Sequence, residues 1–211
     1  MKKSLRLLFA LAVTLMALPI GTFAHFKLLE PASWINEDEK RGDPQKVGPC
    51  GGDPKGQNEK LVSGAITKVT GGSKLHLKVQ ETIYHPGHFR VALAVNSRNE
   101  LPPDPLTTER NTDKGVYSTW AVIQSPPQIP VLADGLFAHY TRPAQPQTYE
   151  TDIQLPNISC ARCTLQVIQF MADHGYNQPG GYSYHHCADL AITADASKLV
   201  DKGWPTAATS N

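Results

Sequence analysis

Two histidines stand in the chain where the nitrogen ligands of one metal ion could come from. If His25 becomes the first residue after cleavage, it presents a free α-amine together with its imidazole. Both groups lose protons readily to a metal, and together they can chelate a single ion. A second imidazole opposite them completes a site of three nitrogens, a ligand set that suits copper. The sequence therefore predicts one copper ion bound at His25.

The second imidazole is expected from His85. The segment Glu81-Thr-Ile-Tyr-His-Pro-Gly-His88 separates two alternating stretches, so it forms a corner between two strands. His85 precedes Pro-Gly, and such a stiff turn holds an imidazole in a fixed position. His88 is the alternative ligand, and without a metal it would be a solvent-facing histidine at the start of a strand. We favour His85 as the ligand.

Residues 1–24 have the three parts of a secretory signal. Three basic residues come first, an apolar run follows over residues 7–20, and Thr22 and Ala24 are small residues of the kind that signal peptidase reads. The apolar run is shorter than the roughly 20 residues that cross a bilayer, and no later stretch qualifies as a membrane span. We predict cleavage after Ala24 and a secreted or periplasmic protein.

Cleavage also changes the charge of the chain. The segment 1–24 carries three basic residues and no acidic ones, so 17 basic and 19 acidic side chains remain, a formal net charge of −2. Without a basic field, nucleic acid is not an expected partner. The remaining 187 residues suffice for one domain with a core. We predict a monomer with a single domain over 25–211, whose tail from about 196 is loosely ordered.

Four cysteines remain after cleavage, and in an oxidising compartment an even number indicates disulfides. Cys160 and Cys163 have the spacing of half a zinc site, but Cys50 and Cys187 do not supply a second close pair. A redox motif would precede a helix, whereas the residues after Cys163 read as a strand. Of the three possible pairings, we favour Cys50–Cys187 with Cys160–Cys163.

The elements that must hold these residues are short strands. In residues 74–80, Leu75, Leu77 and Val79 alternate with polar residues, and residues 88–95 alternate in the same way. Proline and glycine are frequent between such stretches, and no segment has a sustained helical stripe. The sequence predicts an all-β, immunoglobulin/fibronectin-like sandwich with long loops. The expected strands cover residues 74–80, 88–95, 116–123, 147–155, 164–170 and 188–193.

Four features in this order resemble the lytic polysaccharide monooxygenases, secreted copper enzymes with a histidine brace on a β-sandwich. His25 follows the cleavage site, and His85-Pro-Gly resembles the motif of the second brace histidine. The segment Leu165–His174 resembles the penultimate core strand, which in some branches ends in an outer-sphere histidine. The segment Tyr184–Ile192 resembles the final strand, in which an aromatic residue lies three positions before a cysteine.

The resemblance implies a role for each of several residues. His25 and His85 would hold the copper, Tyr184 would occupy the axial position, and His174 would be the outer-sphere hydrogen-bond donor. Branches with that histidine usually carry a glutamine two residues before the axial tyrosine, where this chain has Tyr182. Gln169, on the neighbouring strand, is the candidate for the missing amide.

The adjacent pair His185-His186 is another departure from the family pattern. Neighbouring residues of a strand point to opposite faces, so at most one of the two can face the metal. We expect both to be exposed edge histidines, with enrichment of the site or a second metal as the alternative.

The function implied by the resemblance is oxidative, copper-dependent cleavage of a polysaccharide of the chitin or cellulose class, with an external electron donor. One alternative is a secreted copper-handling protein with a brace-like site and no oxygenase activity. Another is a carbohydrate-binding module, which needs exposed planar aromatic side chains. Trp34, Trp120 and Trp204 are scattered through the chain and support such a module only weakly.

Overall fold

The computed structural model describes residues 25–38 and 42–207, so the predicted signal 1–24 lies outside it. Within these ranges the chain forms strands and one short 3₁₀ turn, without an α-helix, which confirms the predicted all-β class. The elements are β1 (His25–Glu30), β2 (Ile66–Thr70), β3 (Lys74–Ile83), β4 (Gly87–Ala94), η1 (Arg98–Glu100), β5 (Thr107–Thr112), β6 (Gly115–Ala121), β7 (Val131–His139), β8 (Gln147–Gln154), β9 (Cys160–Met171) and β10 (Ser183–Thr193). No helix in the described part of the chain has the length and apolar character needed to cross a bilayer.

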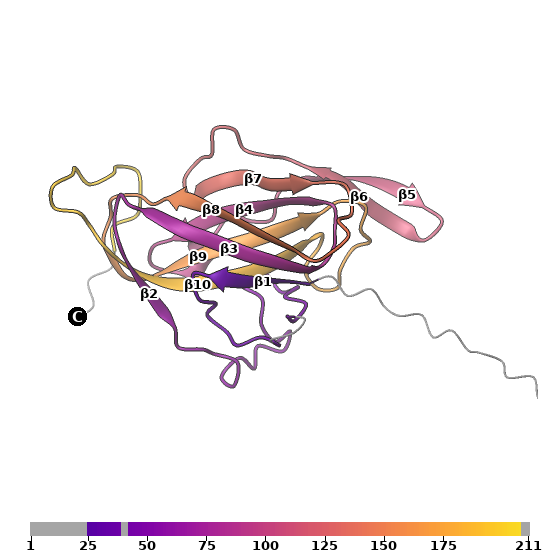
Figure 1. The fold of residues 1–211 in the computed structure, drawn as a ribbon, viewed down its shortest axis with the longest axis horizontal. Coiled ribbons are helices and arrows are strands. Elements are labelled where there is room, and N and C mark those ends of the chain that lie inside the picture. Colours follow the sequence, from indigo (N-terminus) through magenta and orange to yellow (C-terminus); the bar gives the residue numbers. More distant parts are fainter. Residues whose placement is uncertain (1–24, 39–41, 208–211) are drawn as a thin grey trace, which may run out of the picture.

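Two open sheets face each other and form the predicted sandwich (Figure 1). One has the strand order β1-β3-β8, and its neighbours are antiparallel. The other has the order β2-β10-β9-β4-β7, in which β2 and β10 are parallel and the other pairs are antiparallel. Strands β5 and β6 form a separate two-stranded hairpin that projects from one end of the sandwich.

The core lies between the two sheets because each strand turns its apolar alternate positions inward. On β3 these positions are Leu75, Leu77 and Val79, and all three are buried. β4 is buried along its whole length, since its inward residues lie in the core between the sheets and its outward Ala92 and Ala94 pack against connecting segments. Inward residues of the five-stranded sheet complete the core: Phe89, Val91, Leu93, Leu165, Val167, Met171, Ala188, Leu190 and Ile192.

Four strands were not predicted from the sequence, and each lacks a clear apolar alternation. β5 has the sequence TTERNT and is mostly exposed, and β2 is a five-residue strand at the edge of its sheet. β7 is interrupted at Gly135 and Phe137, both of which have positive φ. β1 begins at His25, next to the segment read as a signal. Their pairing partners, rather than their own patterns, make these segments strands.

The two disulfides pair Cys50 with Cys187 and Cys160 with Cys163, as favoured from the sequence. The first ties the long connection between β1 and β2 to β10. In that connection, the Gln45 carbonyl also accepts the backbone N–H of His185 at 2.8 Å. The connection is therefore fastened to the outer side of the five-stranded sheet.

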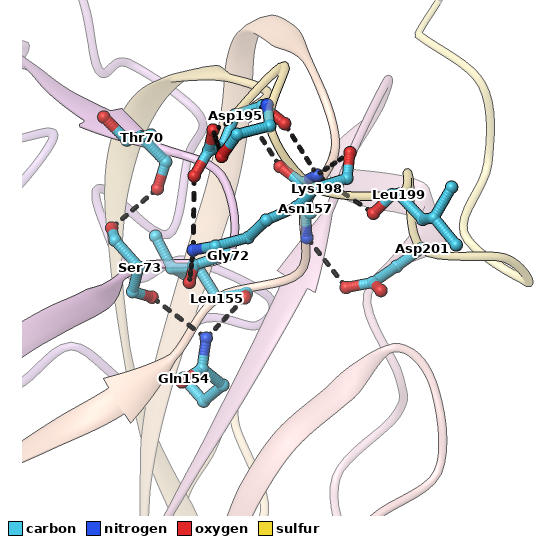
Figure 2. Close-up of polar contacts among 11 residues, drawn as sticks. Thr70, Gly72, Ser73, Gln154, Leu155, Asn157, Asp195, Lys198, Leu199 and Asp201 are labelled. Atoms are coloured by element: carbon cyan, nitrogen blue, oxygen red, sulfur yellow. Dashed lines mark hydrogen bonds and ion pairs between the residues drawn. The ribbon is translucent and has the colours of Figure 1, made fainter.

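The segment after β10 is fastened at the end of the sandwich opposite to the hairpin (Figure 1). Asn157 is buried, and its Nδ2 lies within 3.0–3.2 Å of the carbonyls of Asp195, Lys198 and Leu199 (Figure 2). Its backbone N–H donates to Asp201 Oδ2 at 2.8 Å, and its Oδ1 accepts from Asp195 N. One asparagine thus holds residues 195–201 against the sandwich.

Candidate functional site

The predicted site residues lie at the end of the sandwich where β1 begins and β3 ends. Strand pairing places His25 opposite Ile83, two residues before His85 in the chain. The hydroxyl of Thr82 donates to the His25 carbonyl at 3.0 Å, which fixes the first residue of β1 against β3. His25 and His85 therefore lie on adjoining backbone segments, and both are buried.

The surroundings of His85 keep its imidazole neutral. Burial, followed by the nearby His174, lowers the pKa of His85 to about 4. Its Nδ1 lies 3.4 Å from the Ile83 carbonyl, which can only accept a hydrogen bond, so the lone pair is on Nε2. A neutral imidazole held through one nitrogen, with its lone pair on the other, is the usual form of a metal-binding histidine.

His174 lies against His85, with 4.8 Å between the two ring centroids. Burial is the largest cause that lowers the pKa of His174, and Lys46 adds to it. Its Nδ1 lies 2.6 Å from the Gly175 carbonyl, so this ring too is held through Nδ1. The position of His174 beside His85 agrees with the outer-sphere role that the resemblance implies.

Tyr184 and Gln169 are cross-strand partners on β10 and β9, and both side chains are buried. The Tyr184 ring meets the His85 ring edge-on, with 6.5 Å between the centroids. Gln169 points to the same inner side, and its Nε2 donates to Glu81 Oε1 at 2.7 Å. The structure thus brings together His85, His174 and Tyr184 directly, and Gln169 through Glu81.

Glu81 and His139 are site residues that the sequence analysis missed. Glu81 Oε1 also accepts the backbone N–H of His85 at 2.9 Å and lies 3.2 Å from His139 Nε2. The other ring nitrogen of His139 lies 2.6 Å from the Phe137 carbonyl. Both partners of this ring are acceptors. Burial lowers the pKa of His139, but the hydrogen bonds to Glu81 and Phe137 outweigh burial and raise it overall.

A signal for Glu81 was present in the sequence. It follows Leu75, Leu77 and Val79 in the same period of two, so a carboxylate stands at the next core position of β3. A polar residue at a core position is either a packing fault or part of a site. Gln169 interrupts the inward alternation of β9 in the same way.

The nitrogen donors that His25 and His85 can offer suit copper better than a metal that requires several side-chain ligands. Within residues 25–38 and 42–207, no group of three or more His, Cys, Asp or Glu side chains is arranged to hold a metal. Two imidazoles from His25 and His85, with a terminal amine as third ligand, do not require such a group. Nitrogen ligands of this kind suit copper.

An open groove of about 690 Å³ lies over His85 and His174. Its lining includes four tyrosines, of which Tyr140 and Tyr176 are 55 % and 57 % exposed. The full lining is Tyr84, His85, Pro86, Tyr117, Tyr140, Arg142, Asp173, His174, Gly175, Tyr176 and Asn177. The site therefore opens on an aromatic surface, whereas Trp34, one of the three scattered tryptophans, is buried.

The expectation that His185 and His186 are exposed edge histidines is wrong. Each is only 1 % exposed, because β10 lies between β2 and β9 rather than at the edge of the sheet. His186 shares the inner face with Tyr184, and its Nδ1 lies 2.9 Å from Glu37 Oε1. His185 points to the outer face, where its Nε2 lies 2.8 Å from Asp104 Oδ1.

His88, the rival of His85, is buried on the outer face of β4 and not solvent-facing. Its register partner on β9 is Phe170, and its Nε2 lies 3.8 Å from Asp134 Oδ1. Phe89, next in the chain, points into the core, so His88 faces away from the space between the sheets. The geometry favours His85 as the ligand.

Comparison with protein families gives a match over most of the chain. A family model described as "Lytic polysaccharide mono-oxygenase, cellulose-degrading" matches residues 25–190. No curated protein matches the chain significantly. The matched region begins at His25, the first residue of β1, and ends within β10.

Proposed function

The chain belongs to the lytic polysaccharide monooxygenase family, and from that premise we propose that it cleaves cellulose oxidatively with one copper ion held by His25 and His85. Degradation of a polysaccharide follows from the family itself. The copper, its ligands and the choice of cellulose are the parts that we propose. The observation that carries the copper and its ligands is the meeting of His85, His174 and Tyr184 at the end where β1 begins. The choice of cellulose rests on the description of the family.

The proposed brace needs the α-amine of His25, and therefore cleavage after Ala24. The family match begins at His25, which supports a mature chain that starts there. Members of the family are generally secreted, in agreement with the signal read in residues 1–24. His25 would contribute its amine and imidazole, and His85 the nitrogen not held by the Ile83 carbonyl.

Copper bound here would supply the one-electron chemistry that lets dioxygen or peroxide attack a C–H bond beside the glycosidic link. The residues of the chain position and shield that chemistry. His85 stays neutral at physiological pH, so no proton competes for its coordinating nitrogen. Tyr184 fills the inner side of the site with a buried ring, and His174, through Nε2, can hold a hydrogen bond beside His85.

The substrate would lie across the groove above His85. Tyr140 and Tyr176 offer half-exposed rings on which the flat faces of sugar units can pack, and Arg142 offers hydrogen-bond donors to hydroxyl groups. An open, aromatic surface of this kind suits a polymer chain better than a small molecule enclosed on all sides. Together with the description of the family, it supports a β-linked polysaccharide such as cellulose.

The test uses protein that begins at His25. Copper titration should give one tight site, and cellulose with ascorbate should yield oxidised oligosaccharides, with chitin as the parallel substrate. His85→Asn should abolish both results. His76→Asn is the matched control, because His76 is an exposed histidine near the other end of β3 and should change neither.

A variant with one extra residue before His25 tests the brace itself, because it removes the α-amine from the site. We expect its copper affinity to fall sharply. Equal affinity in this variant would contradict the brace. Tight one-to-one copper binding without oxidised products from either polysaccharide would instead identify a copper-handling protein. No copper binding at all would contradict both functions.

A further inference from the structure

A buried carboxylate, Glu81, lies directly behind the proposed copper ligand. Its side chain is 1 % exposed, and one oxygen, Oε1, accepts from His85 N at 2.9 Å and from Gln169 Nε2 at 2.7 Å. The same oxygen lies 3.2 Å from His139 Nε2. Glu81 is on β3, whereas Gln169 and His139 are on β9 and β7 of the other sheet. One side chain therefore links both sheets to the backbone of His85.

Stability alone does not explain a carboxylate at this position. The preceding inward positions of β3 hold Leu75, Leu77 and Val79, and a further apolar side chain would continue the core. A buried carboxylate loses its hydration and must be compensated by hydrogen bonds and an opposite charge. Apolar replacements of buried ion pairs are often neutral or stabilising. The position of Glu81 therefore indicates a role in the site.

The contact with His85 sets the geometry of the corner after β3. The hydrogen bond from His85 N to Glu81 Oε1 joins two residues that are four positions apart and so closes the corner between them. The His85 imidazole projects from this closed corner, toward His174 and Tyr184. A ligand held within a fraction of an ångström needs such a second layer of contacts.

The contact with Gln169 decides which way its amide points. A carboxylate oxygen only accepts, so the amide must present its NH₂ group to Glu81. The amide oxygen of Gln169 then points away from Glu81, and among the described residues this buried oxygen has no hydrogen-bond partner. A buried acceptor without a partner is uncommon and calls for a functional explanation.

We propose that Glu81 is a positioning residue of the metal site, which fixes the backbone of His85 and orients the amide of Gln169. His139 acts as the partner that keeps the carboxylate in place, held by the Phe137 carbonyl on its other nitrogen. This inference rests on the proposed copper function. It also makes a statement about the metal-free protein, which can be tested separately.

The central variant is Glu81→Gln, which keeps the shape of the side chain and removes its charge and one acceptor. The matched control is Glu100→Gln. Glu100 also accepts backbone N–H groups four and five residues away, from Asn96 and Val95, but it lies beyond the far end of β4. His139→Gln is a second variant, which weakens the carboxylate's support while Glu81 and its hydrogen bond from His85 N remain. Because His139 also interacts with the His85 backbone, this variant supplements Glu81→Gln.

Two measurements separate positioning from general stability. In metal-free protein, Glu81→Gln should shift the His85 amide proton upfield in ¹H–¹⁵N spectra and speed its exchange with solvent. In copper-loaded protein, we expect affinity to fall roughly ten-fold or more, with a changed Cu(II) electron paramagnetic resonance spectrum. His139→Gln should change both in the same direction by less, and Glu100→Gln should change neither.

The outcomes distinguish the inference from the proposed function. Unchanged affinity and an unchanged Cu(II) spectrum in folded Glu81→Gln protein, with a wild type that binds copper, would overturn the positioning role and leave the function standing. A wild type without a copper site would overturn the proposed function and, with it, the metal-site role of Glu81. The predicted amide changes would then still show that Glu81 fixes the His85 backbone. If Glu81→Gln does not fold, His139→Gln decides, and wild-type-like copper binding in it overturns the inference.

Discussion

At the scale of single residues, this sandwich places polar side chains where strand alternation calls for apolar ones. Glu81 and Gln169 do so between the sheets, and each finds a partner in the other. His88 occupies the other phase, on the outer face of β4, and is nevertheless buried, beside Phe170 and Asp134 of the neighbouring strands. Since each of these groups is buried, its hydrogen-bonding possibilities are set by neighbouring residues rather than by water.

His88 should make the stability of the metal-free protein depend on pH. Burial is the largest cause that lowers the pKa of His88, and Arg90 and His139 add to it against Asp134. The unfolded chain, with a pKa of about 6.5 for histidine, therefore takes up protons first as the pH falls. The free energy of unfolding should fall as the pH drops below about 6.5, and His88→Gln should make this dependence shallower.

Urea unfolding at a series of pH values between 7.5 and 4.5 measures this effect. His76→Gln is the control, because the pKa of exposed His76 is raised, chiefly by its hydrogen bond to Asp152. Removing His76 should not flatten the curve. A His88→Gln curve parallel to that of the wild type would contradict the prediction.

At the scale of elements, the β5–β6 hairpin holds the loop that carries His174. Ser118, on β6, is completely buried, and its hydroxyl donates to the Met171 carbonyl at 2.6 Å. The backbone N–H of His174 lies 3.2 Å from the same hydroxyl oxygen. Backbone hydrogen bonds from Ser118 N to His174 O and from Asp173 N to Ser118 O complete the contact. The hairpin is therefore part of the frame of the site.

Ser118→Ala should cost about 1–3 kcal/mol of unfolding free energy, because it leaves buried backbone groups without their hydroxyl partner. It should also speed hydrogen exchange of the His174 amide. Thr119→Ala is the matched control, since the neighbouring hydroxyl hydrogen-bonds to Thr108 across the hairpin. Equal effects of the two substitutions on His174 exchange would show that the hairpin does not hold this loop.

The C-terminal segment depends on one asparagine for its place. Asn157→Asp would turn a carboxylate toward the carbonyls that now receive Asn157 Nδ2. We expect a loss of about 3 kcal/mol, since donors are lost and a charge faces acceptors. Trypsin should then cut faster after Lys198. The same change at exposed Asn111 is the control, and equal cleavage rates for the two variants would contradict the anchoring role.

At the scale of the whole molecule, the two disulfides constrain the chain very differently. Cys50 and Cys187 are 137 residues apart, whereas Cys160 and Cys163 are separated by 3. Loop-closure entropy predicts a larger effect for the longer loop. The first bond also fastens the long β1–β2 connection to a central strand, so it limits how far the beginning of the chain can move from the sandwich.

Replacing both cysteines of the long pair by alanine should lower the free energy of unfolding by about 5 kcal/mol, against about 2 kcal/mol for the short pair. Denaturant unfolding of both double variants, under conditions in which the remaining bond stays oxidised, measures the difference. The contradictory result is an equal or larger loss from the short pair.

The sequence alone determined the fold class, because alternation on β3 and β4 is strong and is fixed by the pleat of a strand. It also favoured the disulfide pairing that the structure shows. A cleavage site and a Pro-Gly corner pointed to His25 and His85 as the proposed ligands, and these two signals depend on neighbours in the chain. For that reason local patterns were sufficient to find them.

Only the tertiary structure decided which other residues surround His85. Glu81, Gln169 and His139 come from three strands in two sheets, and their meeting depends on the register between those strands and on how the sheets pack. It also decided that His185 and His186 are buried, because strand order makes β10 an interior strand. Register and strand order arise from contacts between distant segments, and no local pattern specifies them.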